Sequence, residues 1–306
     1  MSYPVVMWFN GFMTAYSQYD ELLNKVVSAG FITVSYTVSG LESVENELKT
    51  RVDPLIRWIA DGDIDTALSE NVSANVSAIF SSGHSRGGKV ASLAFTSHPD
   101  DVLAAVLVDP VDESAFSPIS QSNPSAVAAL RESGKAVSVI GAGITGSCNP
   151  TEGNYEKFYA AGSGGSWKLV IEQAGHAQFV PGGGRLQDVV CGAGSESRSD
   201  VADIVSADMV SWFSLDAATK DAFVEEASQR PGVTFEVKTE TKDRRMAAAP
   251  DGGAQEGMGG SARPQNAAAP DGGGAEEGRM SGSERPQNAG AHAGAFAIFS
   301  IAFCFF

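Results

Sequence analysis

A serine between two glycines is the feature of this sequence whose residue types and spacing most clearly permit covalent chemistry. The segment reads Gly83-His-Ser85-Arg-Gly87; it follows a short apolar run and precedes a stretch of helical character. A serine on a sharp strand-to-helix turn holds its hydroxyl clear of the backbone, and the glycines let strand and helix approach closely. The pattern therefore predicts that Ser85 is a nucleophile that attacks a carbonyl carbon and forms an acyl intermediate.

A serine hydroxyl needs a general base, and the folded part of the sequence after Ser85 contains His98 and His176. His98 is expected at the far end of the helix that starts at the serine, about 20 Å away at 1.5 Å of rise per residue. His176 follows an apolar strand, in a loop at the carboxyl edge of the sheet, where sites on open α/β sheets gather. We predict His176 as the base and expect His84 to pack beside the serine.

A carboxylate that orients the base is expected between the serine and the histidine in chain order. Asp109 comes directly after a predicted strand, so its side chain is expected at the carboxyl edge of the sheet. We predict Asp109 as this acid, although an aspartate before a proline also commonly opens a turn. Three further carboxylates stay open as alternatives, namely Asp112, Glu113 and Glu152.

The negative charge that develops on the substrate oxygen during acyl transfer needs hydrogen-bond donors. The pattern places one donor at the backbone N–H of Arg86, the residue after the nucleophile. A second is expected in the turn after the first strand, at the backbone N–H of Phe12. No metal and no cofactor is needed for this chemistry, and we predict none.

Strands alternate with helices along the first 245 residues. The strands are predicted at residues 5–9, 31–36, 76–81, 103–108, 137–140 and 167–172. The helices are predicted at residues 15–28, 42–60, 89–97, 152–161, 201–213 and 217–227, with Pro54 kinking or breaking the second of them. This alternation predicts a mostly parallel sheet with helices on both faces, of the α/β-hydrolase type.

Composition changes sharply near residue 245. Residues 1–245 are predicted to form the folded domain, and residues 246–306 a low-complexity tail in which one Gly/Ala/Pro-rich segment occurs twice. The last 14 residues are apolar but shorter than the ~20 that cross a bilayer as a helix. They are expected either to dip into a membrane surface or to have no function.

Charge and cysteine content narrow the function classes. The net charge of −16 argues against nucleic acid and anionic membranes as partners. Three cysteines without C-x-x-C spacing argue against a zinc site; Cys148 and Cys191 are expected either to form a bridge or to remain two thiols. The first residues show no leader pattern, which by itself favours a cytoplasmic protein.

The elbow and several other segments together resemble the chlorophyllase family. The matching segments are Gly83-His-Ser-Arg-Gly-Gly-Lys89, Val108-Asp-Pro-Val-Asp112, Gly175-His176, Tyr16-Ser-Gln18, Gly30-Phe-Ile32, Cys148-Asn-Pro150 and Tyr155-Glu-Lys-Phe-Tyr159. The similarity covers roughly residues 5–214 and implies Ser85, Asp109 and His176 as the catalytic triad. The oxyanion turn has Asn10 where the family usually has histidine, and the family's first strands are expected to be missing from this chain.

The resemblance implies hydrolysis of the phytyl ester of chlorophyll and a chloroplast location. Peripheral contact with membranes is expected only from the apolar C-terminal residues. A large apolar pocket mouth would suit such a substrate. We predict that this mouth is lined by residues that could equally belong to the core: Phe12, Met13, Phe116 and Phe179. The alternatives are a general lipase or carboxylesterase and a non-catalytic pigment- or lipid-binding relative. The oligomeric state is not predicted.

Overall fold

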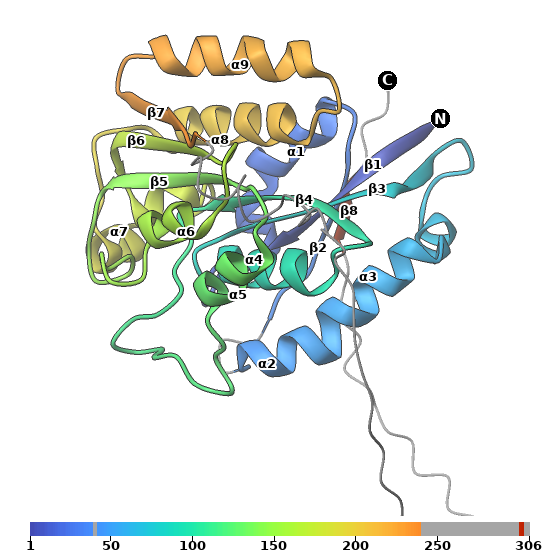
Figure 1. Cartoon of the computed structure of the whole chain (residues 1–306), viewed down its shortest axis with the longest axis horizontal. Coiled ribbons are helices and arrows are strands. Elements are labelled where there is room, and N and C mark those ends of the chain that lie inside the picture. Colours follow the sequence, from blue (N-terminus) through green and yellow to red (C-terminus); the bar gives the residue numbers. More distant parts are fainter. Residues whose placement is uncertain (39–41, 240–299, 303–306) are drawn as a thin grey trace, which may run out of the picture. The chain divides into compact units, whose positions relative to one another are not determined.

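The protein is built around one twisted sheet, seen edge-on in Figure 1. A computed structural model describes residues 1–38, 42–239 and 300–302. Within them the sheet has the strand order β7-β6-β5-β4-β3-β1-β2-β8. The strands are β1 (Ser2–Phe9), β2 (Ile32–Ser35), β3 (Ser73–His84), β4 (Val102–Val108), β5 (Ser138–Ile144), β6 (Trp167–Gly175), β7 (Val233–Val237) and β8 (Ser300–Ala302).

The six neighbouring strands β6, β5, β4, β3, β1 and β2 pair in parallel. Antiparallel pairs occur at the two edges, β6 with β7 and β2 with β8. Parallel strands covered on both faces are expected to be continuously apolar. The sequence of β4, VLAAVLV, has this composition. The predicted mostly parallel sheet of α/β-hydrolase type is confirmed.

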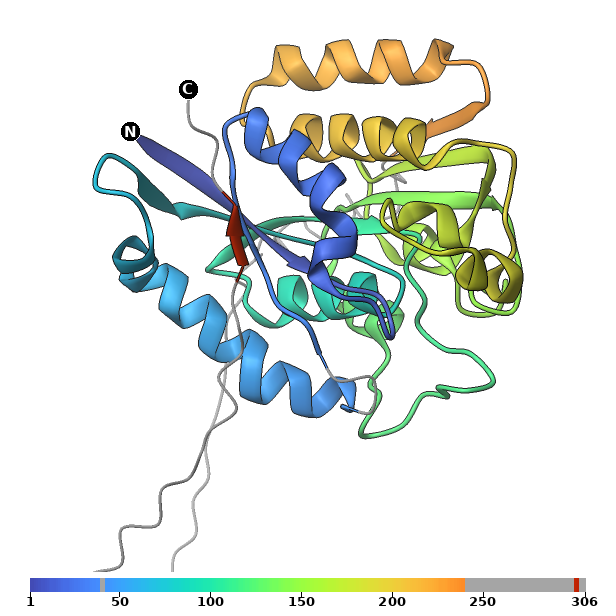
Figure 2. The same ribbon diagram turned by 180° about the vertical axis from the view of Figure 1, so that it is seen from behind.

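Helices cover both faces of the sheet (Figures 1 and 2). The helices on one face are α1 (Asp20–Ser28), α8 (Arg198–Phe213) and α9 (Ala217–Gln229). The helices on the other face are α2 (Val44–Glu47), α3 (Asp53–Ala60), α4 (Arg86–Ser97), α5 (Ala126–Ser133) and α6 (Tyr155–Ala161). Helix α7 (Arg185–Cys191) follows a short 3-10 turn, His176–Phe179, at the end of β6.

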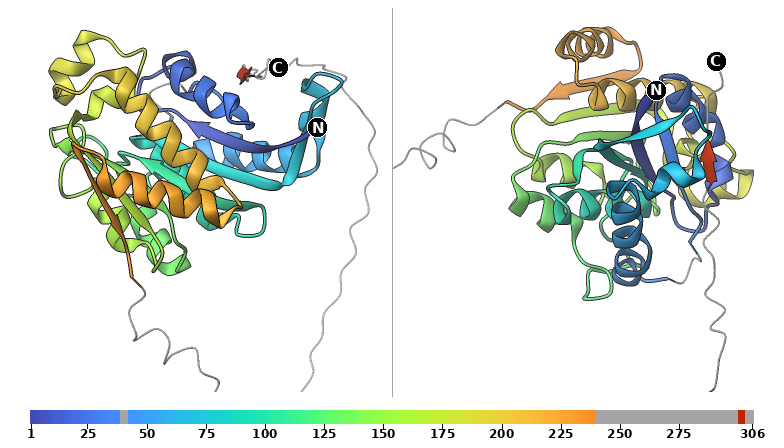
Figure 3. Two further views of the ribbon diagram at one scale, coloured as in Figure 1. Left: turned by 90° about the horizontal axis from the view of Figure 1, so that it is seen from above. Right: turned by 90° about the vertical axis from the view of Figure 1, so that its right-hand side faces the viewer.

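Each face of the sheet buries its own apolar cluster. One cluster joins β-strand residues to α3, α4 and α6, with Leu107 and Phe158 fully buried. The other joins the sheet to α1, α8 and α9, where the rings of Phe80 and Phe213 stack with centroids 4.6 Å apart. Figure 3 shows α8 and α9 as neighbouring layers over this second face. Two filled clusters hold the sheet rigid, and the site at its carboxyl edge rests on this scaffold.

The long helix expected at residues 42–60 has an irregular middle. A π-helical turn, Leu48–Val52, separates α2 from α3, and Pro54 lies in the first turn of α3. Proline has no backbone N–H to donate to the preceding turn, and a single wide turn accommodates this without ending the helix. The predicted disturbance at Pro54 is therefore present as a local widening.

Several elements were not predicted from the sequence. One is helix α5, where Ser125 accepts from the N–H of Ala128 at the start and Gly134 follows the end, both common residue types at these positions. Strand β7 alternates apolar and polar residues, and it follows β6, the last of the predicted strands. The predicted repeat tail lies outside the described residues, except for Ser300–Ala302, which form β8.

Candidate active site

The turn that carries Ser85 has the strained geometry predicted for a nucleophile. Ser85 lies between β3 and α4 with φ 58° and ψ −122°, a conformation that costs a non-glycine residue about 1–3 kcal/mol. The flanking glycines are required by close packing. A Cβ on Gly83 would lie 2.4 Å from the Gly87 carbonyl oxygen, and one on Gly87 would lie 2.0 Å from that of Phe9. The glycines thus allow the elbow to sit directly on the end of β1.

The structure brings Ser85 and His176 together across 91 residues of sequence. The serine Oγ lies 2.9 Å from His176 Nε2. His176 begins the 3-10 turn after β6, at the carboxyl edge of the sheet, and both side chains are buried beside the pocket. This is the distance at which an imidazole can take a hydroxyl proton.

The structure also selects among the candidate acids. Asp109 Oδ2 lies 2.5 Å from His176 Nδ1. Asp112 instead accepts from the Ser125 hydroxyl and the Ala126 N–H at the start of α5. Glu113 is half-buried beside the pocket and Glu152 is exposed. Of the four carboxylates, Asp109 is therefore the one placed against the histidine.

Two further donors hold the Asp109 carboxylate. The Ala142 N–H donates to Oδ1 at 3.0 Å, and the Asn149 amide donates to Oδ2 at 3.1 Å. Asp109 is fully buried with φ 39°, another strained position. Asn149 was not predicted as a site residue; its position directly after Cys148 in a loop gives no local sign of a partner 40 residues away.

Two other histidines in the described part of the chain lie as expected. His98 is at the end of α4, with its Nε2 3.5 Å from Asp53 Oδ1, and takes no part in the site. His84 packs against His176 with ring centroids 4.6 Å apart. Burial, followed by the neighbouring His176, holds the pKa of His84 well below its ordinary value. His84 is therefore neutral at physiological pH, and no second positive charge competes with a protonated His176.

The predicted oxyanion donors belong to Arg86, which follows the serine in the chain, and to the turn after β1, which lies close to the serine. Arg86 is the first residue of α4, so its N–H is one of the donors left without a partner inside the helix. The turn with Phe12 lies close to the elbow, since a Cβ on Gly11 would be 3.5 Å from Ser85 Cβ. The Arg86 guanidinium pairs with buried Glu47 and donates to the Glu42 carbonyl at 2.9 Å, which fastens the start of α4 to α2.

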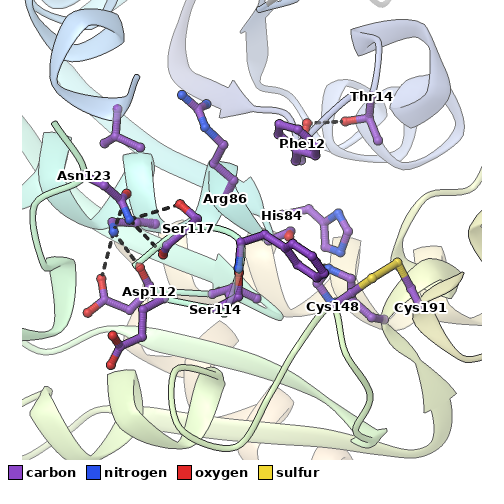
Figure 4. Close-up of a pocket in the computed structure, with 18 of the residues that line it drawn as sticks. Phe12, Thr14, His84, Arg86, Asp112, Ser114, Ser117, Asn123, Cys148 and Cys191 are labelled. Atoms are coloured by element: carbon purple, nitrogen blue, oxygen red, sulfur yellow. Dashed lines mark hydrogen bonds and ion pairs between the residues drawn. A yellow bond between two sulfur atoms is a disulfide. The ribbon is translucent and has the colours of Figure 1, made fainter. Parts of the chain in front are cut away.

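A pocket of about 700 Å³ opens above these residues. Phe12 and Phe116 line it, as predicted, with exposed fractions of 55% and 90%. Figure 4 shows Phe12 and Arg86 along one side of it and the Cys148–Cys191 disulfide along another. A site of this size suits a substrate with a bulky group.

Two predicted lining residues are placed elsewhere. Phe179 is buried in the core, because it ends the 3-10 turn with its ring facing His84 at a centroid distance of 6.0 Å. The prediction that it lines the pocket was wrong. Met13 is 75% exposed on the turn beside Phe12 and is not among the residues that line the pocket.

A loop over residues 111–123 forms one wall of the pocket, and Lys89 holds it. The Lys89 ammonium donates to the Asp112 carbonyl at 2.5 Å and to Asn123 Oδ1 at 2.7 Å. The Asn123 amide in turn donates to Ser117 and Pro118 (Figure 4). Burial lowers the pKa of Lys89 to about 8, although the Asp112 carboxylate opposes this shift.

Of the two states expected for Cys148 and Cys191, a bridge or two thiols, the structure contains the bridge. Cys148 and Cys191 form a disulfide that joins the loop before α6 to the end of α7. Both cysteines line the pocket. The bridge therefore anchors the segment that carries Asn149, the partner of Asp109.

The described residues contain neither a cluster of metal-binding side chains nor a membrane-spanning helix. In residues 1–38, 42–239 and 300–302, no group of three or more His, Cys, Asp or Glu side chains could hold a metal ion. No helix in this part of the chain is long and apolar enough to cross a membrane.

The fold is shared with a solved esterase. A mutant of the esterase rPPE superposes with a TM-score of 0.50 at 15% sequence identity, covering 70% of this chain and 76% of that one. Similarity at this identity shows the α/β-hydrolase fold alone.

Sequence relatives identify the family. Chlorophyllase-2 of Arabidopsis thaliana is 28% identical over 221 residues, covering 64% of this chain and 68% of that protein. Chlorophyllase-1 of the same plant is 26% identical over 233 residues, covering 69% and 71%. The protein is thus a carboxylic ester hydrolase of the α/β-hydrolase fold. It belongs to the chlorophyllase family, whose model, described as Chlorophyllase, matches residues 1–237.

Proposed function

We propose that this protein hydrolyses the phytyl ester of chlorophyll to chlorophyllide and phytol, with Ser85, His176 and Asp109 as its catalytic triad. The observation that carries the triad is the continuous contact from Ser85 Oγ through both ring nitrogens of His176 to Asp109 Oδ2. The substrate is supported by membership of the chlorophyllase family and by the large pocket with exposed aromatic side chains.

The proposed reaction has two steps. Ser85 Oγ attacks the ester carbonyl while His176 Nε2 takes the hydroxyl proton and passes it to the departing phytol oxygen. Water then attacks the acyl-enzyme with His176 as base, which releases chlorophyllide and restores the serine. Asp109 keeps the proton of the neutral ring on Nδ1 and stabilises the charged ring that forms at each step.

The surroundings of the triad are suited to this charge movement. Asp109 accepts from two donors besides the histidine, which compensates the burial of its negative charge. The N–H groups of Arg86 and Phe12 are proposed to bind the substrate oxygen as it becomes negative. No protein-bound metal is required, and the magnesium ion belongs to the substrate.

The test is release of chlorophyllide from detergent-solubilised chlorophyll, with p-nitrophenyl butyrate as a second substrate. Ser85→Ala should abolish both activities. Ser92→Ala is the matched control, because it removes a buried hydroxyl from α4, the helix that begins at the elbow, and should leave both rates unchanged. Turnover of the small ester without chlorophyllide would overturn the chlorophyll assignment. Full activity in Ser85→Ala would overturn the triad.

A chloroplast location and contact with pigment-bearing membranes belong to the same proposal. Phe116, Met13 and Val189 are at least 75% exposed and lie on segments near the pocket mouth. Membrane contact is tested by repeating the chlorophyll assay with neutral lipid vesicles in place of detergent. If the protein contacts membranes, turnover should be retained and the protein should co-sediment with the vesicles. Imaging of the full protein fused to a fluorescent marker tests the location; a signal outside plastids would contradict it.

A further inference from the structure

Two buried polar side chains behind the triad, Tyr19 and His84, have no part in the proton transfers described above. Tyr19 ends the 3-10 turn Tyr16–Tyr19 and has no exposed surface. His84 is the last residue of β3, directly before the serine, and is 2% exposed. A polar group is costly to bury unless it is hydrogen-bonded, so the partners of these side chains indicate their role.

The Tyr19 hydroxyl connects the oxyanion turn to the elbow. It accepts from the Gly11 N–H at 3.2 Å and lies 2.9 Å from His84 Nδ1. Thr14 supports the same turn, since its hydroxyl donates to the Gly11 carbonyl at 2.8 Å. Gly11 directly precedes Phe12, so the Tyr19 bond acts on the peptide next to the proposed oxyanion donor.

The hydroxyl of Tyr19 and the ring of His84 are both neutral. Burial raises the pKa of Tyr19 to about 12, so its hydroxyl keeps a proton to donate. His84 is kept neutral chiefly by burial, and the backbone of His176 only partly opposes this effect. The hydrogen bond between them has two forms: Tyr19 donates to Nδ1, or Nδ1–H donates to the hydroxyl while the hydroxyl donates to Thr14 Oγ1, 3.3 Å away. The orientation of the phenol and the tautomer of the imidazole thereby determine each other.

The space around Gly11 is tight. A Cβ there would lie 3.1 Å from His84 Nδ1, 3.2 Å from the Tyr19 hydroxyl and 3.5 Å from Ser85 Cβ. The His84 ring is also confined between His176 and Phe179, with centroids 4.6 Å and 6.0 Å away. One small group of side chains therefore touches the oxyanion turn, the nucleophile and the base together.

We propose that Tyr19 and His84 are positioning residues that hold the Gly11–Phe12 turn at the correct distance from Ser85 for oxyanion binding. This inference rests on the proposed function, because it assumes that the Phe12 N–H binds the oxyanion. Within the described part of the chain, neither side chain forms a hydrogen bond to the Ser85 hydroxyl or to the His176 ring. Their effect should appear in the stabilisation of the tetrahedral intermediate and hardly in substrate binding.

The first test is Tyr19→Phe, which removes one oxygen atom and leaves the ring in place. With p-nitrophenyl butyrate we expect kcat to fall about 10- to 100-fold, less than the 10²–10³ of a lost oxyanion donor, with KM within about twofold. Inactivation by diethyl p-nitrophenyl phosphate should slow by the same factor, because its phosphoryl oxygen needs the same donors. Tyr159→Phe, which removes a buried hydroxyl from α6, is the matched control and should change neither rate.

The second test uses His84, so that the inference stays testable if Tyr19→Phe does not fold. His84→Leu should lose as much kcat as Tyr19→Phe, while His84→Gln, whose amide oxygen can accept from the tyrosine, should recover part of it. The double variant Tyr19→Phe with His84→Leu should be no slower than either single variant, because both break one connected unit.

The outcomes separate this inference from the proposed function. Unchanged kcat in Tyr19→Phe, or additive losses in the double variant, would overturn the positioning role while the contrast between wild type and Ser85→Ala still supports the triad. A loss confined to KM or to thermal stability would also overturn it. A wild type that hydrolyses neither ester would overturn the proposed function and this inference with it.

Discussion

Among the residues that the structure describes, two aspartates are completely buried, and their surroundings differ. Asp109 lies at the carboxyl edge of the sheet and accepts from Ala142 and Asn149, with His176 at 2.5 Å. Asp208 lies on α8 beneath the sheet and accepts from the Ser138 hydroxyl at 2.6 Å. Its other carboxylate oxygen has no hydrogen-bond partner among the described residues.

The two carboxylates differ in their hydrogen-bond partners and not in their burial. Burial disfavours the charged form of any acid, while donors that bind the carboxylate favour it. With a single hydroxyl donor, the pKa of Asp208 is raised by burial to about 7. Asp109, the carboxylate with several donors, is the one that faces His176. A carboxylate can stabilise an imidazolium only if it faces that ring.

The largest effect is expected when the paired carboxylate itself is changed. Asp109→Asn keeps the shape of the side chain but removes the charge and can hold His176 in the wrong tautomer. We expect kcat for p-nitrophenyl butyrate to fall by roughly 10³–10⁴, with the fold retained. Asp208→Asn is the matched control and should keep the wild-type rate. A loss of less than tenfold in Asp109→Asn would mean that another group orients the base.

A smaller effect is expected when one donor to Asp109 is replaced. Asn149→Asp keeps an oxygen that can accept from the Gly146 N–H, as Asn149 does at 2.7 Å, but puts a negative charge beside Asp109. Asn149→Leu removes the donor without adding charge. We expect losses in kcat of about 100-fold for the first variant and about tenfold for the second, because removing a donor leaves His176 and Ala142 in place. Equal rates in the two variants would show that the contact between Asn149 and Asp109 is not the cause of the lost activity.

The smallest effect on activity, and a clear effect on stability, is expected at Asp208. In the folded protein Asp208 holds its proton until about pH 7, whereas in the unfolded chain an aspartate releases it near pH 4. The wild type therefore loses stability as the pH rises from about 4 to about 7, and Asp208→Asn does not share this loss. Above pH 7 the free energy of unfolding of Asp208→Asn should exceed that of the wild type by a few kcal/mol. Each unit by which folding raises the pKa of Asp208 contributes about 1.4 kcal/mol.

Urea unfolding of wild type and Asp208→Asn at pH 4, 6 and 8 measures this difference. The variant should be matched with wild type at pH 4 and more stable at pH 8, with an unchanged denaturant dependence. A difference independent of pH would show that Asp208 is ionised in the folded protein.

Local patterns accounted for much of the fold and for the residue types of the site. The apolar runs predicted the six parallel strands, and the glycines around Ser85 predicted the elbow with its strained backbone. Position after a strand was enough to bring Asp109 and His176 to the same edge of the sheet. These predictions succeeded because each depends on interactions within a few residues of chain.

Other features depended on contacts that sequence spacing does not encode. The sequence favoured Asp109 but left Asp112 open as an alternative, and packing against His176, 67 residues from Asp109, distinguished them. Phe179 looked suited to the pocket mouth, but the direction of one short turn buried it beside His84. The edge strand β7 was missed because its pairing with β6 is decided across the sheet.

By itself, the sequence determined a mostly parallel sheet, a serine elbow and the edge at which a site must lie, since periodicity and turn chemistry act locally. Tertiary structure alone decided which acid meets the base, that Cys148 bonds Cys191, and that Tyr19 reaches His84. These pairs are separated by 43 to 67 residues. They form only when both faces of the sheet are packed, because their geometry is the outcome of many contacts distributed over the whole fold.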